Sequence, residues 1–109
     1  MPQLRVLIAD DHPVFRHGIR GLLETTAEFV TVGEAETGEQ AVRRSAELRP
    51  DVVLMDIQMP GIGGIEATRQ ITTLAPLTRV IMLTVSSSAP DITDAVLERL
   101  RRDAAGKAP

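Results

Sequence analysis

The sequence predicts an α/β domain in which helices cover both faces of an open parallel sheet. Short apolar runs rich in Val, Ile, Leu and Met recur along the chain, and each is followed by a longer segment with apolar residues at helical spacing. The expected strands are residues 4–9, 29–34, 51–55 and 79–83. Strands that alternate with helices at this pitch form right-handed βαβ units, which build a parallel sheet between two helical layers.

The first expected helix follows Pro13, whose fixed φ suits a first helical turn. Apolar side chains at offsets of zero, four, seven and eight share one face of this helix: Phe15, Ile19, Leu22 and Leu23. Thr37 is placed to cap a second helix over residues 38–48. Arg49 precedes Pro50, and this pair ends the second helix because a residue before proline is disfavoured in the helical region.

Two further helices complete the alternation. A third helix carries Ala67, Ile71 and Leu74 and is stopped by Pro76. A last helix is expected over residues 91–105, with Ile92, Val96 and Leu100 in register. The whole chain, residues 1–109, is long enough for one domain and too short for two.

Composition narrows the class of protein. The net charge of −3 argues against direct binding of nucleic acid by this chain. Cysteine is absent, which excludes a disulfide framework and thiol chemistry. The N-terminus lacks the pattern of a signal peptide, and no apolar run approaches the length of a membrane span. We therefore expect a soluble cytoplasmic protein without membrane contacts.

Three carboxylates follow two of the buried strands. Asp10 and Asp11 come after the first strand, and Asp56 ends the apolar run VVLMD. Ligands of open parallel sheets bind outside the carboxyl ends of the strands, so these acids are expected to converge there. Mg²⁺ is held by one or two carboxylates while it keeps several waters, and a cation would relieve their repulsion. The alternative interpretation is solvated turn chemistry, which is common for a single Asp after a strand.

The segments VLIADDHPVFRHGIRGLL, VGEAETGEQAV, LRPDVVLMDIQMPGIGGIEATRQI and TRVIMLT occur in this order along the chain. Together they resemble a response-regulator receiver domain of the LuxR/NarL type, from about Leu4 to Val96. The resemblance implies a flavodoxin-like sheet with strand order 2-1-3-4. It also implies a protein of two-component signalling that is not an enzyme beyond catalysing its own phosphorylation and dephosphorylation.

The resemblance further implies roles for individual residues. Asp56 corresponds to the aspartate that accepts a phosphoryl group from a sensor histidine kinase. Asp10 and Asp11 correspond to the pair that binds Mg²⁺, with the main-chain carbonyl of Gln58 as a further ligand. Thr84 corresponds to the switch residue whose hydroxyl turns toward the phosphoryl group.

The C-terminal part departs from the family pattern. The family's fifth strand, which ends in a lysine, has no counterpart, and Lys107 is the only lysine of the chain. We expect a truncated or internally deleted receiver, whose last helix corresponds to the family's helix four, its helix five or a fusion of both. The fourth strand would then be a sheet edge, which predicts a homodimer through residues 79–105. Whether a DNA-binding domain belongs to the full protein is left open.

Two other functions remain as hypotheses. A degenerate receiver would act as a phosphorylation-independent dimerisation or interaction module, which the absent lysine and fifth strand favour. A phosphatase with an aspartate nucleophile ranks lower, because such enzymes need a second Asp two residues later as general acid and base, and that position is Gln58.

Overall fold

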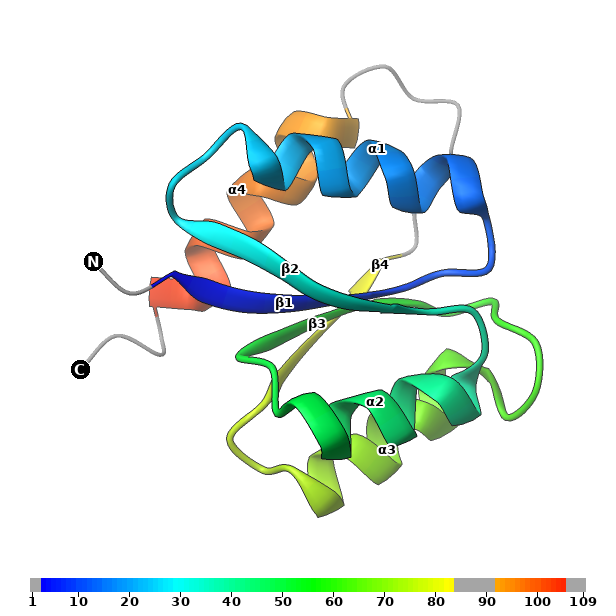
Figure 1. Ribbon diagram of the computed structural model, residues 1–109. Coiled ribbons are helices and arrows are strands. Elements are labelled where there is room, and N and C mark those ends of the chain that lie inside the picture. The colour runs from blue at the N-terminus through cyan, green and yellow to red at the C-terminus, as the bar shows by residue number, and fades with distance from the viewer. Residues whose placement is uncertain (1–2, 84–91, 106–109) are drawn as a thin grey trace.

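The computed structural model describes residues 3–83 and 92–105, with side chains at 3–83 and 96–102. The described elements alternate along the chain as predicted (Figure 1). The strands are β1 (Leu4–Ala9), β2 (Phe29–Ala35), β3 (Val52–Asp56) and β4 (Arg79–Leu83). The helices are α1 (Pro13–Glu24), α2 (Gly38–Leu48), α3 (Gly63–Leu74) and α4 (Ile92–Ala105).

The four described strands form one parallel sheet in the order β2-β1-β3-β4, which confirms the predicted flavodoxin-like topology. Helices α1 and α4 cover one face of the sheet, and α2 and α3 cover the other (Figure 1). Among the described strands, β4 pairs only with β3 and lies at an edge of the sheet. The order places β1 and β3 side by side at the centre, so the residues that follow their carboxyl ends become neighbours.

The core has two halves because successive residues of a strand point to opposite faces. Val6 and Ile8 of β1 pack on one face with Ile19 and Leu23 of α1, and Leu100 of α4 joins the same cluster. The other cluster contains residues of β1, β3, α2 and α3, including Leu7, Ala9, Val53, Met55, Ala67 and Ile71. Because both faces of the sheet are covered, the central strands β1 and β3 are buried along most of their length and consist largely of apolar residues.

Local signals place the helix ends where the sequence predicts them. Pro13 lies in the first turn of α1. The Thr37 side chain accepts a hydrogen bond from the Gln40 amide at 3.1 Å and caps α2. Helix α2 ends at Leu48 and is capped by Arg49, which adopts a left-handed conformation with φ 48° and whose amide donates to the carbonyl of Ser45 at 3.0 Å. These contacts satisfy backbone groups that a helix end leaves unpaired.

The bounds of some elements differ from the predicted ones. Strand β2 extends to Ala35 rather than residue 34, and strand β3 spans Val52–Asp56 rather than residues 51–55. Just before β3, the Asp51 carboxylate accepts a hydrogen bond from the Arg5 amide at 2.8 Å. Leu74, one of the apolar residues that predict the third helix, lies in α3 but is 65% exposed. It is the last residue of α3, where the helix runs past the apolar cluster that covers Ala67 and Ile71.

Candidate functional site

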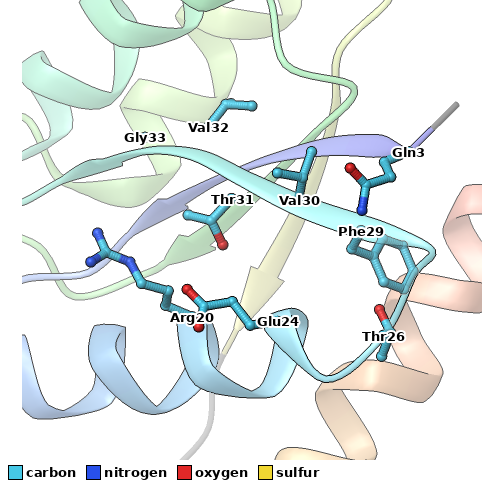
Figure 2. Close-up of a pocket in the computed structure, with 9 residues that line it drawn as sticks. All are labelled: Gln3, Arg20, Glu24, Thr26, Phe29, Val30, Thr31, Val32 and Gly33. Carbon is cyan, nitrogen blue, oxygen red and sulfur yellow. The ribbon is translucent and has the colours of Figure 1, made fainter.

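Two surface hollows among the described residues lie away from the carboxyl ends of β1 and β3. One, of about 490 Å³, is lined by the first residues of β2 and the second half of α1, including Phe29, Arg20 and Glu24 (Figure 2). Another, of about 540 Å³, lies between the ends of α2 and α3 and the start of β4. Neither is lined by Asp10, Asp11 or Asp56. The candidate site is the cluster of acidic side chains at the carboxyl ends of β1 and β3, and it lies outside both of these hollows.

The structure brings the three predicted carboxylates together. Asp10 and Asp11 follow β1, and Asp56 is the last residue of the neighbouring strand β3. Together with His12 they form a group whose potential ligand atoms all lie within 4.8 Å of one another. Side chains 45 residues apart in sequence meet here because β1 and β3 are paired in parallel, Ala9 opposite Met55.

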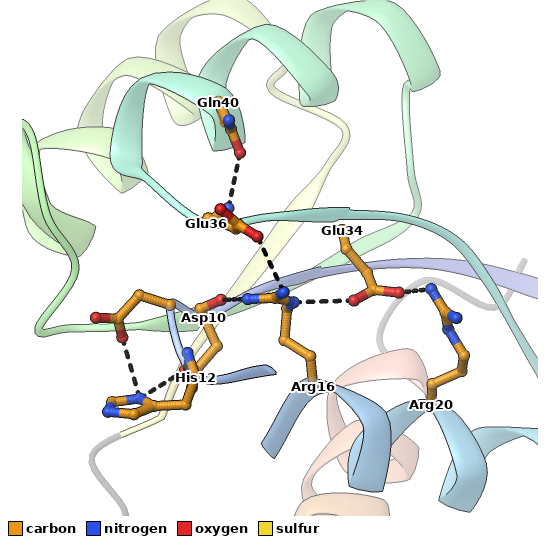
Figure 3. Close-up of polar contacts among 8 residues, drawn as sticks. Asp10, His12, Arg16, Arg20, Glu34, Glu36 and Gln40 are labelled. Carbon is orange, nitrogen blue, oxygen red and sulfur yellow. Dashed lines mark hydrogen bonds and ion pairs between the residues drawn. The ribbon is translucent and has the colours of Figure 1, made fainter. Parts of the chain in front are cut away.

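His12 is a member of this cluster that the sequence did not point to. It occupies the position before α1, and its amide donates to Asp10 Oδ1 at 2.8 Å. Its ring Nδ1 lies 3.0 Å from the same oxygen, and the side chain is 67% exposed (Figure 3). The hydrogen bond with Asp10 raises the pKa of His12, and the charges of Asp11 and Asp10 raise it further. The ring of His12 therefore lies against the acidic cluster, and the acids favour its protonated form.

Asp11 has an oxygen without a proper partner. Its Oδ1 is buried, and although His12 Nδ1 lies 3.0 Å away, no group among the described residues makes a well-oriented hydrogen bond to it. A buried carboxylate oxygen left in this state is costly, because it has lost water without a replacement. Such an atom indicates a position where a ligand is expected.

Asp56 is half-buried and remains within reach of solvent. Burial raises the pKa of its carboxyl, and the nearby charges of Asp10 and Asp11 act in the same direction. The amide of Gln58 opposes this effect by donating to Asp56 Oδ1 at 3.2 Å. The carboxylate at the end of β3 is therefore destabilised as an anion by its surroundings, and a cation between the three acids would relieve this.

The donor set fits a hard divalent cation. Carboxylate oxygens are the ligands that Mg²⁺ prefers in proteins, and one or two of them suffice because the ion keeps several waters. The unsatisfied Asp11 oxygen and the mutual repulsion of three acids are the two features of this structure that such an ion would correct. A soft metal is not favoured, because the chain has no cysteine.

Comparison with known proteins decides the family. The family model for the response regulator receiver domain matches residues 6–102. The chain belongs to this family. Receiver domains are signalling domains of two-component systems, so the predicted identity is confirmed.

Individual relatives agree with this assignment. The chain is 45% identical over 87 residues to the response regulator GacA of Pseudomonas viridiflava, a match that covers 80% of this chain and 41% of GacA. It is 29% identical to a two-component response regulator of the LuxR family from Aurantimonas sp. SI85-9A1, with a TM-score of 0.86 over 97% of this chain and 88% of that one.

The response regulator domain of CheB from Thermotoga maritima has the same fold. It is 29% identical, with a TM-score of 0.84 over 93% of this chain and 96% of that one. This receiver therefore matches a response-regulator domain over nearly its whole length, whereas it spans well under half of GacA.

Some residues predicted for the receiver's site are placed by the structure and others are not. Gln58 lies beside Asp56 and contacts it through its amide. Thr84 and Lys107 lie outside the described residues. No described helix of the receiver combines the length and apolar character required to cross a membrane.

Proposed function

We propose that this receiver domain accepts a phosphoryl group on Asp56 from a sensor histidine kinase, in a reaction that depends on Mg²⁺. The observation that carries the proposal is the convergence of Asp10, Asp11 and Asp56, with potential ligand atoms within 4.8 Å, at the carboxyl ends of β1 and β3. Membership of the receiver family supports it.

In the proposed reaction an oxygen of Asp56 attacks the phosphorus of a phosphohistidine. A P–O bond forms to the carboxylate as the P–N bond to the kinase imidazole breaks, which leaves an acyl phosphate on Asp56. Asp56 is suited to this role because its carboxylate ends a rigid buried strand and stays accessible. The Gln58 amide, which donates to Asp56 Oδ1, keeps the carboxylate oriented.

The proposed metal ligands are the carboxylates of Asp10, Asp11 and Asp56 and the main-chain carbonyl of Gln58. When bound, Mg²⁺ supplies positive charge that offsets the repulsion between the carboxylate and the incoming phosphoryl group. Asp10 and Asp11 would hold the ion next to the Asp56 carboxylate. The fold keeps the three carboxylates close together so that they can share it. His12 would give up its contact with the acids, because its ring Nδ1 and the metal compete for the same oxygens.

The proposed signal is carried by the charge of the acyl phosphate. It adds negative charge and acceptor oxygens at the end of β3, to which the Thr84 hydroxyl would donate. The role of Thr84 stays a prediction from the family motif. The whole protein's targets lie outside this proposal, since the chain spans 41% of the length of GacA.

Mass spectrometry of the intact chain tests the phosphoryl transfer. Wild type, Asp56→Asn and Asp11→Asn are incubated with acetyl phosphate, each with Mg²⁺ and with EDTA. We expect a phosphoryl adduct on wild type only with Mg²⁺, a much slower gain on Asp11→Asn and none on Asp56→Asn. A wild-type chain that gains no phosphoryl group with Mg²⁺ would refute the proposed activity, and an adduct on Asp56→Asn would refute the assigned residue.

A second part of the proposal is homodimerisation through residues 79–105. It is supported by the position of β4, which among the described strands has a neighbour on one side only and carries the uncharged run VIML. Strand edges of this kind pair readily with another chain. Sedimentation equilibrium with and without acetyl phosphate tests the dimer. A monomer at every concentration in both states would contradict it. If a dimer forms, Met82→Lys should weaken it.

A further inference from the structure

Arg16 is a buried cation that neither the sequence motifs nor the proposed chemistry uses. It lies one turn into α1, and only 7% of the residue is exposed. An arginine is rarely buried to this degree unless its guanidinium is fully paired. The partners of Arg16 come from the residues that follow β1 and from the end of β2 (Figure 3).

Three nitrogens of the Arg16 guanidinium donate hydrogen bonds to three different residues. Nη1 donates to the main-chain carbonyl of Asp10 at 2.6 Å, Nε donates to Glu34 Oε1 at 2.9 Å, and Nη2 donates to Glu36 Oε1 at 3.1 Å. The planar fork of arginine makes such bonds in fixed directions, which a lysine cannot reproduce. The side chain therefore ties α1 to the acidic loop after β1 and to the end of β2.

The bond to Asp10 completes a clamp on the backbone of the acidic pair. The Asp10 amide donates to the carbonyl of Ala35 at 3.0 Å, and its own carbonyl accepts from Arg16. Because a peptide unit is planar, fixing the Asp10 carbonyl also fixes the amide of Asp11. The backbone on both sides of the Asp10 Cα is thus held in place by hydrogen bonds. This fixes the directions in which the Asp10 and Asp11 side chains leave the backbone.

Charge pairing of the glutamates does not account for this arrangement. Glu34 has a second cationic partner, Arg20, which lies one turn further along α1. The side chain of Glu36 is 61% exposed, and its backbone amide donates to the Gln40 side chain at 2.8 Å. Among the described residues, only Arg16 donates a hydrogen bond to the carbonyl of Asp10, and this bond is buried.

We propose that Arg16 is the positioning residue of the metal site, which holds the Asp10–Asp11 peptide so that the two carboxylates present a preformed acidic pair to the cation. This inference rests on the proposed function, because it concerns the same magnesium site. Partners that orient metal ligands change metal affinity by roughly 10–100-fold when they are removed. The glutamates at the end of β2 orient Arg16 in turn, so the β2–α2 connection contributes to the site without touching the metal.

Titration with the metal alone tests the inference. Mn²⁺ and Mg²⁺ are titrated into wild type, Arg16→Met, Arg16→Lys and Arg20→Met, with binding followed by calorimetry. Arg20→Met is the matched control, because it removes a guanidinium from the same helix and the same glutamate but does not contact Asp10. We expect affinity to fall by about 10–100-fold in Arg16→Met, to fall less in Arg16→Lys, and to stay within about twofold in Arg20→Met.

Two further readouts separate positioning from a general loss of structure. Leu23→Ala creates a cavity under the same helix, and it should lower stability without changing metal affinity in the folded fraction. Amide exchange at Asp10 and Asp11 should accelerate in Arg16→Met more than exchange in the middle of β3. In phosphorylation by acetyl phosphate, the half-saturating Mg²⁺ concentration should rise while the rate at saturating Mg²⁺ changes little.

The possible outcomes distinguish the two proposals. A wild-type chain that binds neither ion overturns the proposed function itself. If wild type binds and Arg16→Met binds equally well, or if Leu23→Ala loses affinity to the same extent, Arg16 is a structural ion pair and the inference is overturned. Should Arg16→Met not fold, Arg16→Lys decides: unchanged metal affinity in that variant also overturns the inference.

Discussion

Gly64 packs directly against the main chain of Asp56. A Cβ on Gly64 would collide with the carbonyl oxygen of Asp56 and lie 2.9 Å from Cα of Ile57. The Gly64 amide donates to the carbonyl of Ile57 at 3.1 Å, so the first turn of α3 rests on the peptide that follows the candidate phosphoacceptor. Glycine is required here because the backbone atoms cannot move away as a flexible side chain would.

Gly64→Ala should therefore displace the end of β3. We expect a loss of about 1–3 kcal/mol in the free energy of unfolding, as for other overpacked sites, measured by urea denaturation. Gly18→Ala is the matched control, since a Cβ there has nothing within 4 Å and the helix should gain roughly 0.5–1 kcal/mol. A Gly64→Ala variant as stable as wild type would contradict the close packing.

Leu100→Ala tests how the last helix joins the domain. Leu100 of α4 is fully buried in the same cluster as Ile19 and Leu23 of α1. Removing a buried leucine side chain costs about 2–5 kcal/mol, and we expect a loss in this range by chemical denaturation. Leu74→Ala, at a leucine that is 65% exposed, should change stability by less than about 0.5 kcal/mol. Equal effects of the two variants would mean that α4 does not pack on this core.

Ser45→Ala should increase stability. Ser45 lies in α2 and is 1% exposed, and its hydroxyl has no hydrogen-bond partner among the described residues. An unpaired buried hydroxyl costs about 1–3 kcal/mol, and alanine is also the better helix former, so we expect a gain on the order of 1 kcal/mol. The midpoint of urea unfolding measures it. A clear loss of stability would show that the hydroxyl has a partner in solution.

The ion pair on α3 gives a pH-dependent contribution. Hydrogen bonds from Arg69 and Gln70 lower the pKa of Glu66 from 4.5 to about 2. Because the folded-state pKa lies below the unfolded value, the stabilisation is present above about pH 4.5 and is lost as pH falls toward about 2. The unfolding free-energy difference between wild type and Glu66→Gln should shrink over this interval. NMR titration of the Glu66 carboxyl checks the pKa itself, and a value near 4.5 would contradict the pairing.

Asp56→Asn should stabilise the metal-free protein. Burial and the charges of Asp10 and Asp11 raise the pKa of Asp56, which means that the surroundings oppose its ionised form at neutral pH. Removing the charge should raise the unfolding free energy in EDTA, because a carboxyl whose pKa is raised on folding destabilises the folded state once it is ionised. With Mg²⁺ present the advantage should shrink, since under the proposed function the ion binds folded wild type through Asp56 and stabilises it. A variant less stable than wild type in EDTA would show that repulsion is not significant.

Much of the fold could be predicted from local signals. Three of these signals are the apolar runs, Pro13 at the start of α1 and the Thr37 cap on α2. Each acts within a few residues, so each can be recognised from the sequence alone. The acids after two strands pointed to one edge of the sheet for the same reason: parallel strands present their carboxyl ends together. The exposure of Leu74 could not be predicted, because helical periodicity does not reveal where the sheet beneath a helix stops.

The sequence by itself determined the order of strands and helices and which acids end the central strands, because hydrophobic periodicity and turn chemistry are local. Only the tertiary structure decided that His12 joins the acids, that Arg16 clamps the Asp10 carbonyl and that Gly64 presses on Asp56. These contacts depend on the direction of each side chain after the strands have paired. That direction is set by packing across elements rather than by neighbours in sequence.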